Sequence, residues 1–212
     1  METAWSVFYG AVGTLGVLHG IADAFQIPYD QKMIFIWIVL SSVIWGTAFG
    51  WKRHRKYLFP TAVGLFVWIG LWRWKEICEG ICRSMERMTE AVNAYYQFSW
   101  DAVKYVKTGG ISTEQTAILA AGGLVSSLLV GGFLQKKGRI LLAVLFAFGF
   151  LAPFLVGRVP ENRTVWELLI GIMGLLAMQT ALPGKQRKIK FFGTANGMLI
   201  GIAAIAFVGS AF

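Results

Sequence analysis

Charged residues are scarce in this sequence, since Asp, Glu, Lys and Arg make up only 15% of its 212 residues. Soluble domains carry about a quarter. Hydrophobic residues make up 56% of the chain, and the mean hydropathy is +0.60. So little charge excludes an ordinary water-soluble domain, and the composition indicates a membrane protein.

Cysteine and histidine are also scarce, with two of each. Cys78 and Cys82 are one helical turn apart, but His19 and His54 lie far from them in the sequence and complete no zinc set. Within one helix the two thiols meet the geometry of a disulfide poorly, so we interpret them as free or buried. No cysteine or serine can be paired with an oriented base. We therefore expect no catalytic residues, no metal site and no cofactor.

What the sequence does contain is a series of long uncharged runs. A helix that crosses the hydrocarbon layer needs about 20 such residues, and in lipid a helix satisfies its own backbone amides. The runs do not alternate apolar and polar residues as barrel strands do. We predict an all-α, polytopic membrane bundle that forms a single membrane domain over residues 1–212. It should contain about seven transmembrane helices, at 4–22, 33–51, 57–74, 115–135, 140–157, 165–183 and 191–212.

Three short connections, after the second, fourth and sixth predicted spans, are strongly basic. They hold eleven of the 20 basic residues and no acidic residue: Lys52, Arg53, Arg55, Lys56, Lys136, Lys137, Arg139, Lys185, Arg187, Lys188 and Lys190. Positive charge is retained on the cytoplasmic side of short loops. We therefore predict a bacterial plasma-membrane protein with a cytoplasmic N-terminus and an extracellular C-terminus. Such juxtamembrane clusters suit anionic lipid, so the expected partner is the bilayer and not nucleic acid.

One segment, at about 74–107, carries too many charges to span the membrane. Its apolar residues recur at steps of three and four, with charged residues mostly between them, which is typical of an amphipathic helix. The apolar residues are Cys78, Ile81, Met85, Met88, Val92 and Tyr95. An aromatic group lies near its end and comprises Tyr95, Tyr96, Phe98, Trp100 and Tyr105. We predict an extracellular or interfacial helix that serves as a structural elbow or as a docking platform.

His19 and Asp23 form the polar pair of greatest interest. They are four residues apart, so they share a face of the first predicted span. An ionisable residue within a span is a functional hypothesis by default, and a proton relay is one interpretation. The other is structural, because Asp23 is near the outer end of the span and a neutral His19 can bond to a neighbouring helix.

Four stretches carry a resemblance to a known family. They are Phe25-Gln26-Ile27-Pro28, the basic turn after the second span, Glu90-Ala91-Val92-Asn93-Ala94-Tyr95-Tyr96, and Ala152-Pro153-Phe154-Leu155-Val156-Gly157. Their order resembles the N-terminal membrane region of bacterial transglutaminase-like membrane proteins. In that family the bundle is followed by an extracellular domain with a cysteine, histidine and aspartate triad. Nothing in this sequence can supply the triad, so no catalytic residue is carried over.

The resemblance implies a non-catalytic membrane domain that anchors an extracellular transglutaminase- or protease-like domain of a longer protein. A transporter or channel subunit is the first alternative, and it should show a midplane cavity lined by polar groups such as His19. The second alternative is a non-enzymatic assembly partner in a membrane complex. That partner should expose a helix face containing the small residues Gly16 and Gly20, which allow close helix approach.

Overall fold

The computed structural model describes residues 2–100, 111–135 and 139–180, which fold into seven α-helices without any strand. The helices are α1 (Glu2–Ala24), α2 (Gln31–Gly50), α3 (Arg55–Trp72), α4 (Trp74–Tyr96), α5 (Ile111–Gln135), α6 (Arg139–Leu155) and α7 (Asn162–Thr180). The all-α prediction is confirmed for these residues. Each of the first six predicted spans overlaps a helix, and the seventh, 191–212, lies outside the described residues.

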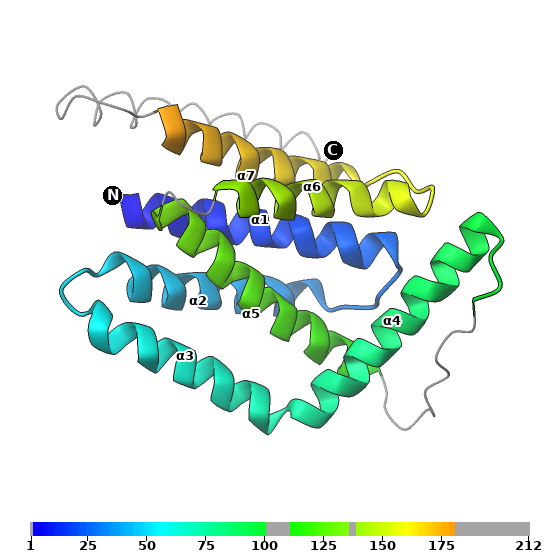
Figure 1. The fold of residues 1–212 in the computed structure, drawn as a ribbon, viewed down its shortest axis with the longest axis horizontal. Coiled ribbons are helices and arrows are strands. Elements are labelled where there is room, and N and C mark those ends of the chain that lie inside the picture. The colour runs from blue at the N-terminus through cyan, green and yellow to red at the C-terminus, as the bar shows by residue number, and fades with distance from the viewer. Residues whose placement is uncertain (1, 101–110, 136–138, 181–212) are drawn as a thin grey trace.

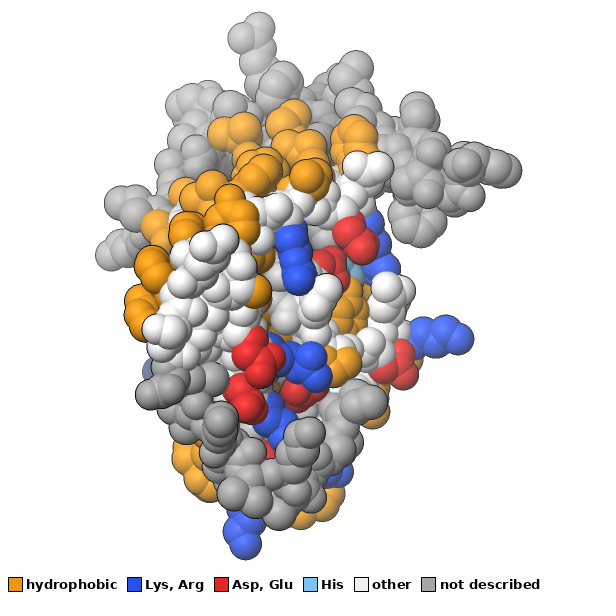
Figure 2. Space-filling model, turned by 90° about the vertical axis from the view of Figure 1, so that its right-hand side faces the viewer, with side chains coloured by type: hydrophobic (Ala, Val, Ile, Leu, Met, Phe, Trp, Pro, Cys, Tyr) orange, Lys and Arg blue, Asp and Glu red, His pale blue; other side chains and the backbone are white. Residues whose placement is uncertain are grey.

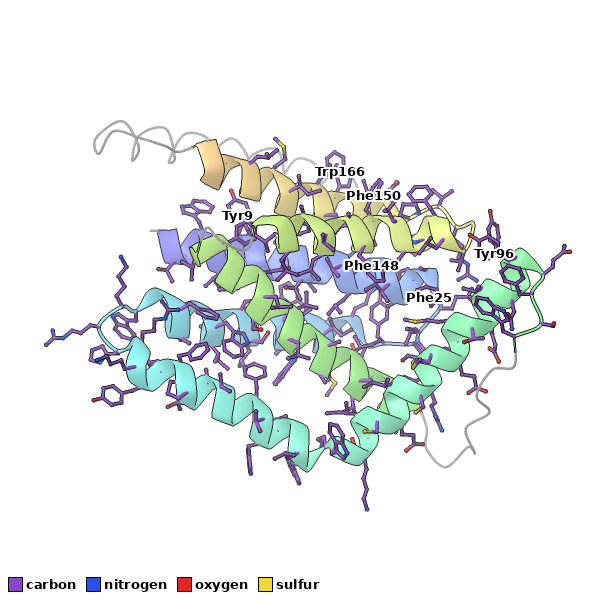
Figure 3. All side chains as sticks on the ribbon, in the orientation of Figure 1. Tyr9, Phe25, Tyr96, Phe148, Phe150 and Trp166 are labelled. Atoms are coloured by element: carbon purple, nitrogen blue, oxygen red, sulfur yellow. The ribbon has the colours of Figure 1, made fainter. Side chains whose placement is uncertain are left out.

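α1 is the central helix and packs against α2, α5, α6 and α7 (Figure 1). Its glycines explain how several neighbours can approach so closely. A Cβ atom at Gly16 would lie 2.9 Å from the Leu168 backbone nitrogen of α7, and one at Gly20 would meet the Gly149 carbonyl oxygen of α6. Tyr9, which has no exposed surface, lies against α7 at Gly174 (Figure 3).

Three helical segments are long and apolar enough to cross a membrane: Thr3–Ala24, Gln31–Gly50 and Thr113–Leu134. The apolar segment Leu141–Leu155 of α6 is shorter. Large hydrophobic side chains also remain on the outside of the bundle, among them Trp166 of α7 at 42% exposure (Figure 3). An outer surface of this kind suits lipid and not water, so the described part of the chain has the character of a membrane protein.

α2 and α5 are joined by polar contacts that leave no indole nitrogen unpaired at their interface. The Trp37 indole donates to the Leu119 carbonyl at 2.8 Å, and the Trp45 indole donates to the Gly123 carbonyl at 3.2 Å. The Phe66 ring of α3 stacks on Trp45, with 4.9 Å between centroids. Bonds of this kind suit an apolar environment, where an unpaired N–H is costly.

α4 is an amphipathic helix, but the prediction that it runs to residue 107 was wrong. The helix ends at Tyr96 because Gln97 adopts a left-handed conformation, with a φ of 56°. The Asn93 side-chain amide then donates to the Trp100 carbonyl oxygen at 2.8 Å, which turns the chain back. The structure does not describe residues 101–110.

The packed face of α4 is rotated from the predicted stripe in the first half of the helix, whereas the stripe residues Met88 and Val92 in its second half pack against the core. Ile77 and Gly80 are its buried residues, whereas the predicted stripe members Ile81 and Met85 are 48% and 62% exposed. Gly80 explains the rotation, because a Cβ atom there would meet the Thr113 carbonyl oxygen of α5. Close approach at this glycine therefore sets the face that α4 turns toward the bundle.

α3 packs more loosely than the other described helices near it, with only Ala62 buried. Arg73 is the single residue between the end of α3 and the start of α4, and the two helices meet there at a sharp bend (Figure 1). Trp68 and Trp72 stack on each other at 6.0 Å near this bend, and both are exposed.

α1 and α6 end at the same end of the bundle, and both end in a left-handed turn. The Ile27 amide bonds to the Ala22 carbonyl at 2.9 Å, around Gln26 with a φ of 52°. The Arg158 amide bonds to the Pro153 carbonyl at 2.9 Å, around Gly157 with a φ of 66°. This hydrogen-bond pattern defines a Schellman motif. We call this end of the bundle, which carries the α1–α2 and α6–α7 connections, the α1–α2 end.

Candidate functional site

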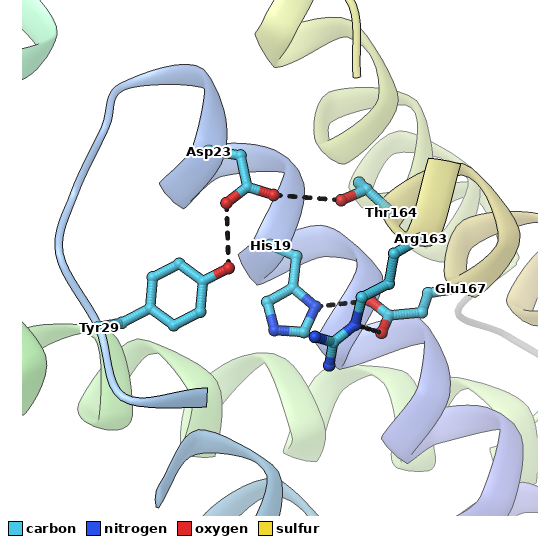
Figure 4. Close-up of polar contacts among 6 residues, drawn as sticks. All are labelled: His19, Asp23, Tyr29, Arg163, Thr164 and Glu167. Atoms are coloured by element: carbon cyan, nitrogen blue, oxygen red, sulfur yellow. Dashed lines mark hydrogen bonds and ion pairs between the residues drawn. The ribbon is translucent and has the colours of Figure 1, made fainter. Parts of the chain in front are cut away.

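Polar side chains gather where the last turns of α1 meet the first turns of α7 and the α1–α2 connection (Figure 4). His19 is 1% exposed, and its Nδ1 lies 2.6 Å from Glu167 Oε2. The second Glu167 oxygen accepts a hydrogen bond from Arg163 Nε at 3.0 Å. A distance of 2.6 Å is short for a hydrogen bond between a nitrogen and a carboxylate oxygen, and this pair connects α1 to α7 inside the bundle.

Asp23 is held one turn further along α1 by two neutral hydroxyl groups. Tyr29 donates to its Oδ1 at 3.0 Å, and Thr164 donates to its Oδ2 at 3.3 Å. Burial, and then the charge of the Asp23 carboxylate and the hydrogen bond to it, hold the pKa of the Tyr29 phenol above its ordinary value. Tyr29 is therefore a protonated donor across the physiological pH range.

His19 and Asp23 lie close together at this end of α1, as their spacing predicts, but each has its own partner from another element. The sequence analysis missed Glu167, Tyr29 and Thr164. Glu167 carried a signal, because it is a lone acidic residue beside the uncharged run of α7. Nothing in the sequence indicated that it would reach a histidine 148 residues away.

The remaining nitrogen of His19, Nε2, is buried and has no hydrogen-bond partner. The Tyr29 ring stacks on the imidazole, with 5.4 Å between centroids. The arrangement can hold a proton between His19 and Glu167 and can lock two helices together. The cluster contains no cysteine or serine, and the described residues hold no group of three His, Cys, Asp or Glu side chains that could bind a metal ion.

A second polar cluster joins α4 to the same end of the bundle. Arg87 Nε donates to Glu114 Oε1 at 2.8 Å, and the Glu114 side chain is only 5% exposed. The same guanidinium also donates to the Gln26 carbonyl oxygen at 3.4 Å. Through Arg87, α4 is therefore tied to both α5 and the α1–α2 connection.

The aromatic group at the end of α4 forms a continuous exposed stack in the described part of the chain. Tyr96 stacks on Phe98 at 5.6 Å, and Phe98 stacks on Trp100 at 5.1 Å. Tyr95 packs its ring where a Cβ atom of Gly157 would lie, so the tip of α4 rests on the α6–α7 connection. Tyr105 lies outside the described residues.

Cys78 and Cys82 are free, partly buried thiols on α4. His54 lies in the α2–α3 connection, at the opposite end of the bundle from His19 (Figure 1). Both histidines therefore lie on other elements than the two thiols.

Figure 2 looks onto the α1–α2 end, where acidic and basic side chains gather and hydrophobic side chains border them. A hollow of about 720 Å³ opens there between the α1–α2 and α6–α7 connections.

Comparison with protein-family models, with curated proteins and with solved structures found no match. The functional assignment therefore depends on the geometry of this end and on the distribution of charge.

Proposed function

We propose that this chain is a non-catalytic, multi-pass membrane domain that anchors and orients an extracellular transglutaminase- or protease-like domain at its α1–α2 end. The observation that carries the proposal is the separation of charge between the two ends of the bundle. It is supported by the resemblance of the sequence to the membrane region of transglutaminase-like proteins.

The α2–α3 connection and the first turn of α3 are basic and contain no acid: their charged residues are Lys52, Arg53, Arg55 and Lys56. The start of α1, the end of α5 and the start of α6 lie at this same end (Figure 1). Apart from Glu2, the acidic residues that the structure describes belong to the last turn of α1, the α1–α2 and α6–α7 connections, α4, the first turn of α5 and the second turn of α7. This asymmetry favours a cytoplasmic α2–α3 end and an extracellular α1–α2 end.

Exposed aromatic residues support α3 as a further span despite its loose packing. Trp51 and Tyr57 are exposed at one end of it, and Trp68 and Trp72 at the other. Such residues concentrate at the two membrane–water interfaces. With α1, α2, α5, α6 and α7 as spans and a further span at 191–212, the proposal has a cytoplasmic N-terminus and an extracellular C-terminus in a bacterial plasma membrane.

α4 supports a positioning role because it is held to the bundle along its length. Gly80 contacts α5, Arg87 bonds to Glu114, and Tyr95 packs on Gly157. A helix held at three points presents its exposed aromatic stack in a fixed place. We infer that this stack is the platform on which the extracellular domain rests.

Cysteine labelling on intact cells tests the orientation. In a Cys78→Ser, Cys82→Ser background, Val159→Cys should react with a membrane-impermeant maleimide, because Val159 is 87% exposed in the α6–α7 connection. His54→Cys should react only after lysis. Labelling of His54→Cys in intact cells, with Val159→Cys protected, would show the opposite orientation and defeat the proposal.

The absence of catalysis is tested with the purified chain in nanodiscs. We expect no peptide hydrolysis and no amine incorporation into a glutamine peptide above the buffer rate, because neither thiol on α4 has a histidine partner in the described structure. Cys78→Ala and Cys82→Ala should behave as the unmodified chain does. An activity that either substitution abolishes would contradict the non-catalytic assignment.

A transporter or channel subunit is the second candidate, and the buried His19 with its unpartnered Nε2 is the observation that favours it. Proton flux into liposomes, abolished by His19→Leu, would support this candidate over the first.

The assembly-partner alternative is weaker, because Gly16 and Gly20 face α7 and α6 and not the outside. Gly197 and Gly201, which form the other small-residue pair, lie outside the described residues.

A further inference from the structure

The hollow at the α1–α2 end, which we call the outer basin, has walls set by backbone hydrogen bonds. Pro28 comes from the α1–α2 connection, Val159 and Pro160 come from the α6–α7 connection, and Asp23 lies in the last turn of α1. Both connections leave their helices through the Schellman motifs described above. Its volume of about 720 Å³ lies in the range of sites that bind small molecules.

The carboxylate of Asp23 has no cationic partner. Both of its oxygens accept from neutral hydroxyl groups, and no Lys, Arg or His nitrogen of the described residues forms an ion pair with it within 4.0 Å. Arg158 donates instead to the Asp23 and Ala24 carbonyl oxygens, and Arg163 pairs with Glu167. The Asp23 carboxylate therefore has no ion-pair partner among the described residues, and the one guanidinium that lines the basin, that of Arg158, is bonded to backbone carbonyls.

The surroundings of Asp23 favour the binding of a cation beside its carboxylate. It lies at the C-terminal end of α1, where the helix dipole disfavours a carboxylate. Glu161 adds a second carboxylate to the lining. The positive N-terminal end of α2 is already capped, since Asp30 accepts from the Lys32 and Met33 amides at 2.9 and 3.4 Å.

We propose that the outer basin binds the alkylammonium side chain of a polypeptide lysine, with the nitrogen at the Asp23 carboxylate. The methylene stem lies against Pro28, Val159 and Pro160, since such a stem buries well on apolar walls while its head stays polar. A hydroxyl group already occupies one acceptor position on each Asp23 oxygen. A compact ammonium can use the acceptor positions that remain, whereas a planar guanidinium binds best when both carboxylate oxygens are open to it side by side.

The basin is a different feature from the aromatic stack on α4, and it does not depend on which domain the chain anchors. Its occupant follows from charge complementarity. An anion would meet two carboxylates against the single guanidinium of Arg158, and a calcium ion would need six to eight oxygen ligands. An extracellular segment that carries a lysine is the partner with matching chemistry.

The test is ligand-observed NMR on the chain in phosphatidylcholine nanodiscs, with Nα-acetyl-lysine N-methylamide as the probe. We expect a dissociation constant on the order of 1 mM for a single side chain. The norleucine amide, which has a similar stem without the ammonium, should bind at least about tenfold more weakly. Asp23→Asn should weaken lysine binding by at least about tenfold, because it removes the charge. Its amide keeps groups that can bond to Tyr29 and Thr164.

Asp30→Asn is the matched control, because it removes the same charge at the same end while leaving a good N-cap for α2. It should bind the lysine amide within about twofold of the unmodified chain, since Asp30 does not line the basin. Equal binding of the lysine and norleucine amides, or unchanged binding in Asp23→Asn, would overturn the proposal. Tighter binding of the arginine amide would overturn the choice of ammonium. Loss of lysine binding when phosphatidylethanolamine is added would assign the ammonium to lipid and overturn the polypeptide source.

Discussion

Glu167→Leu is expected to lower the free energy of unfolding by about 3 kcal/mol, because it leaves His19 buried with both ring nitrogens unpaired. Adding His19→Leu should recover part of this loss, since the double variant removes both polar groups from the interface of α1 and α7. The measurement is a double-mutant cycle on equilibrium unfolding in detergent. Coupling between the two positions should exceed about 1 kcal/mol.

Glu90→Leu serves as the control for Glu167→Leu. Glu90 is exposed on α4, so the same change of residue should alter stability by no more than about 0.5 kcal/mol. Additive effects of the His19 and Glu167 substitutions would show that the two side chains do not interact. The connection between α1 and α7 would then have to come from packing alone.

Gly20→Ala is the second change with a large expected effect. Its Cβ atom would meet the Gly149 carbonyl oxygen, which is backbone and cannot move aside as a flexible side chain can. α1 and α6 would have to separate, and overpacking of this kind costs about 1–3 kcal/mol. We expect the thermal midpoint of the chain in detergent to fall accordingly.

Gly64→Ala provides the matched control on α3. Nothing lies within 4 Å of a Cβ atom placed at Gly64, and alanine is favoured over glycine inside a helix by about 0.5–1 kcal/mol. This substitution should leave stability unchanged or raise it slightly. If Gly20→Ala and Gly64→Ala had the same effect, the close contact of α1 with α6 would be refuted.

The sequence predicted the helices well because each lipid-facing segment must satisfy its own backbone amides. The uncharged runs at 4–22 and 33–51 coincide with α1 and α2 for this reason. It predicted the end of α4 and the packed face of its first half poorly. Those depend on a left-handed residue, Gln97, and on close approach at Gly80, which only the neighbouring elements determine.

The candidate site was predicted in part. The spacing of His19 and Asp23 placed both on one face of α1, because residues four apart are neighbours on a helix. Their partners could not be predicted, since Glu167 and Thr164 belong to a helix far along the chain. Which helices are neighbours in the bundle is set by glycine contacts such as Gly16 with Leu168, and these have no distinct pattern in the sequence.

The single-residue joint at Arg73 has a mechanical consequence. If α3 spans the bilayer as we propose, its loose packing alone would leave its tilt free to respond to membrane thickness. Because only one residue joins the two helices, any such tilt would also move the 23-residue α4, a rod of roughly 35 Å. Since the far end of that rod is held at Gly157 by Tyr95, α4 would act as a strut that limits the tilt of α3.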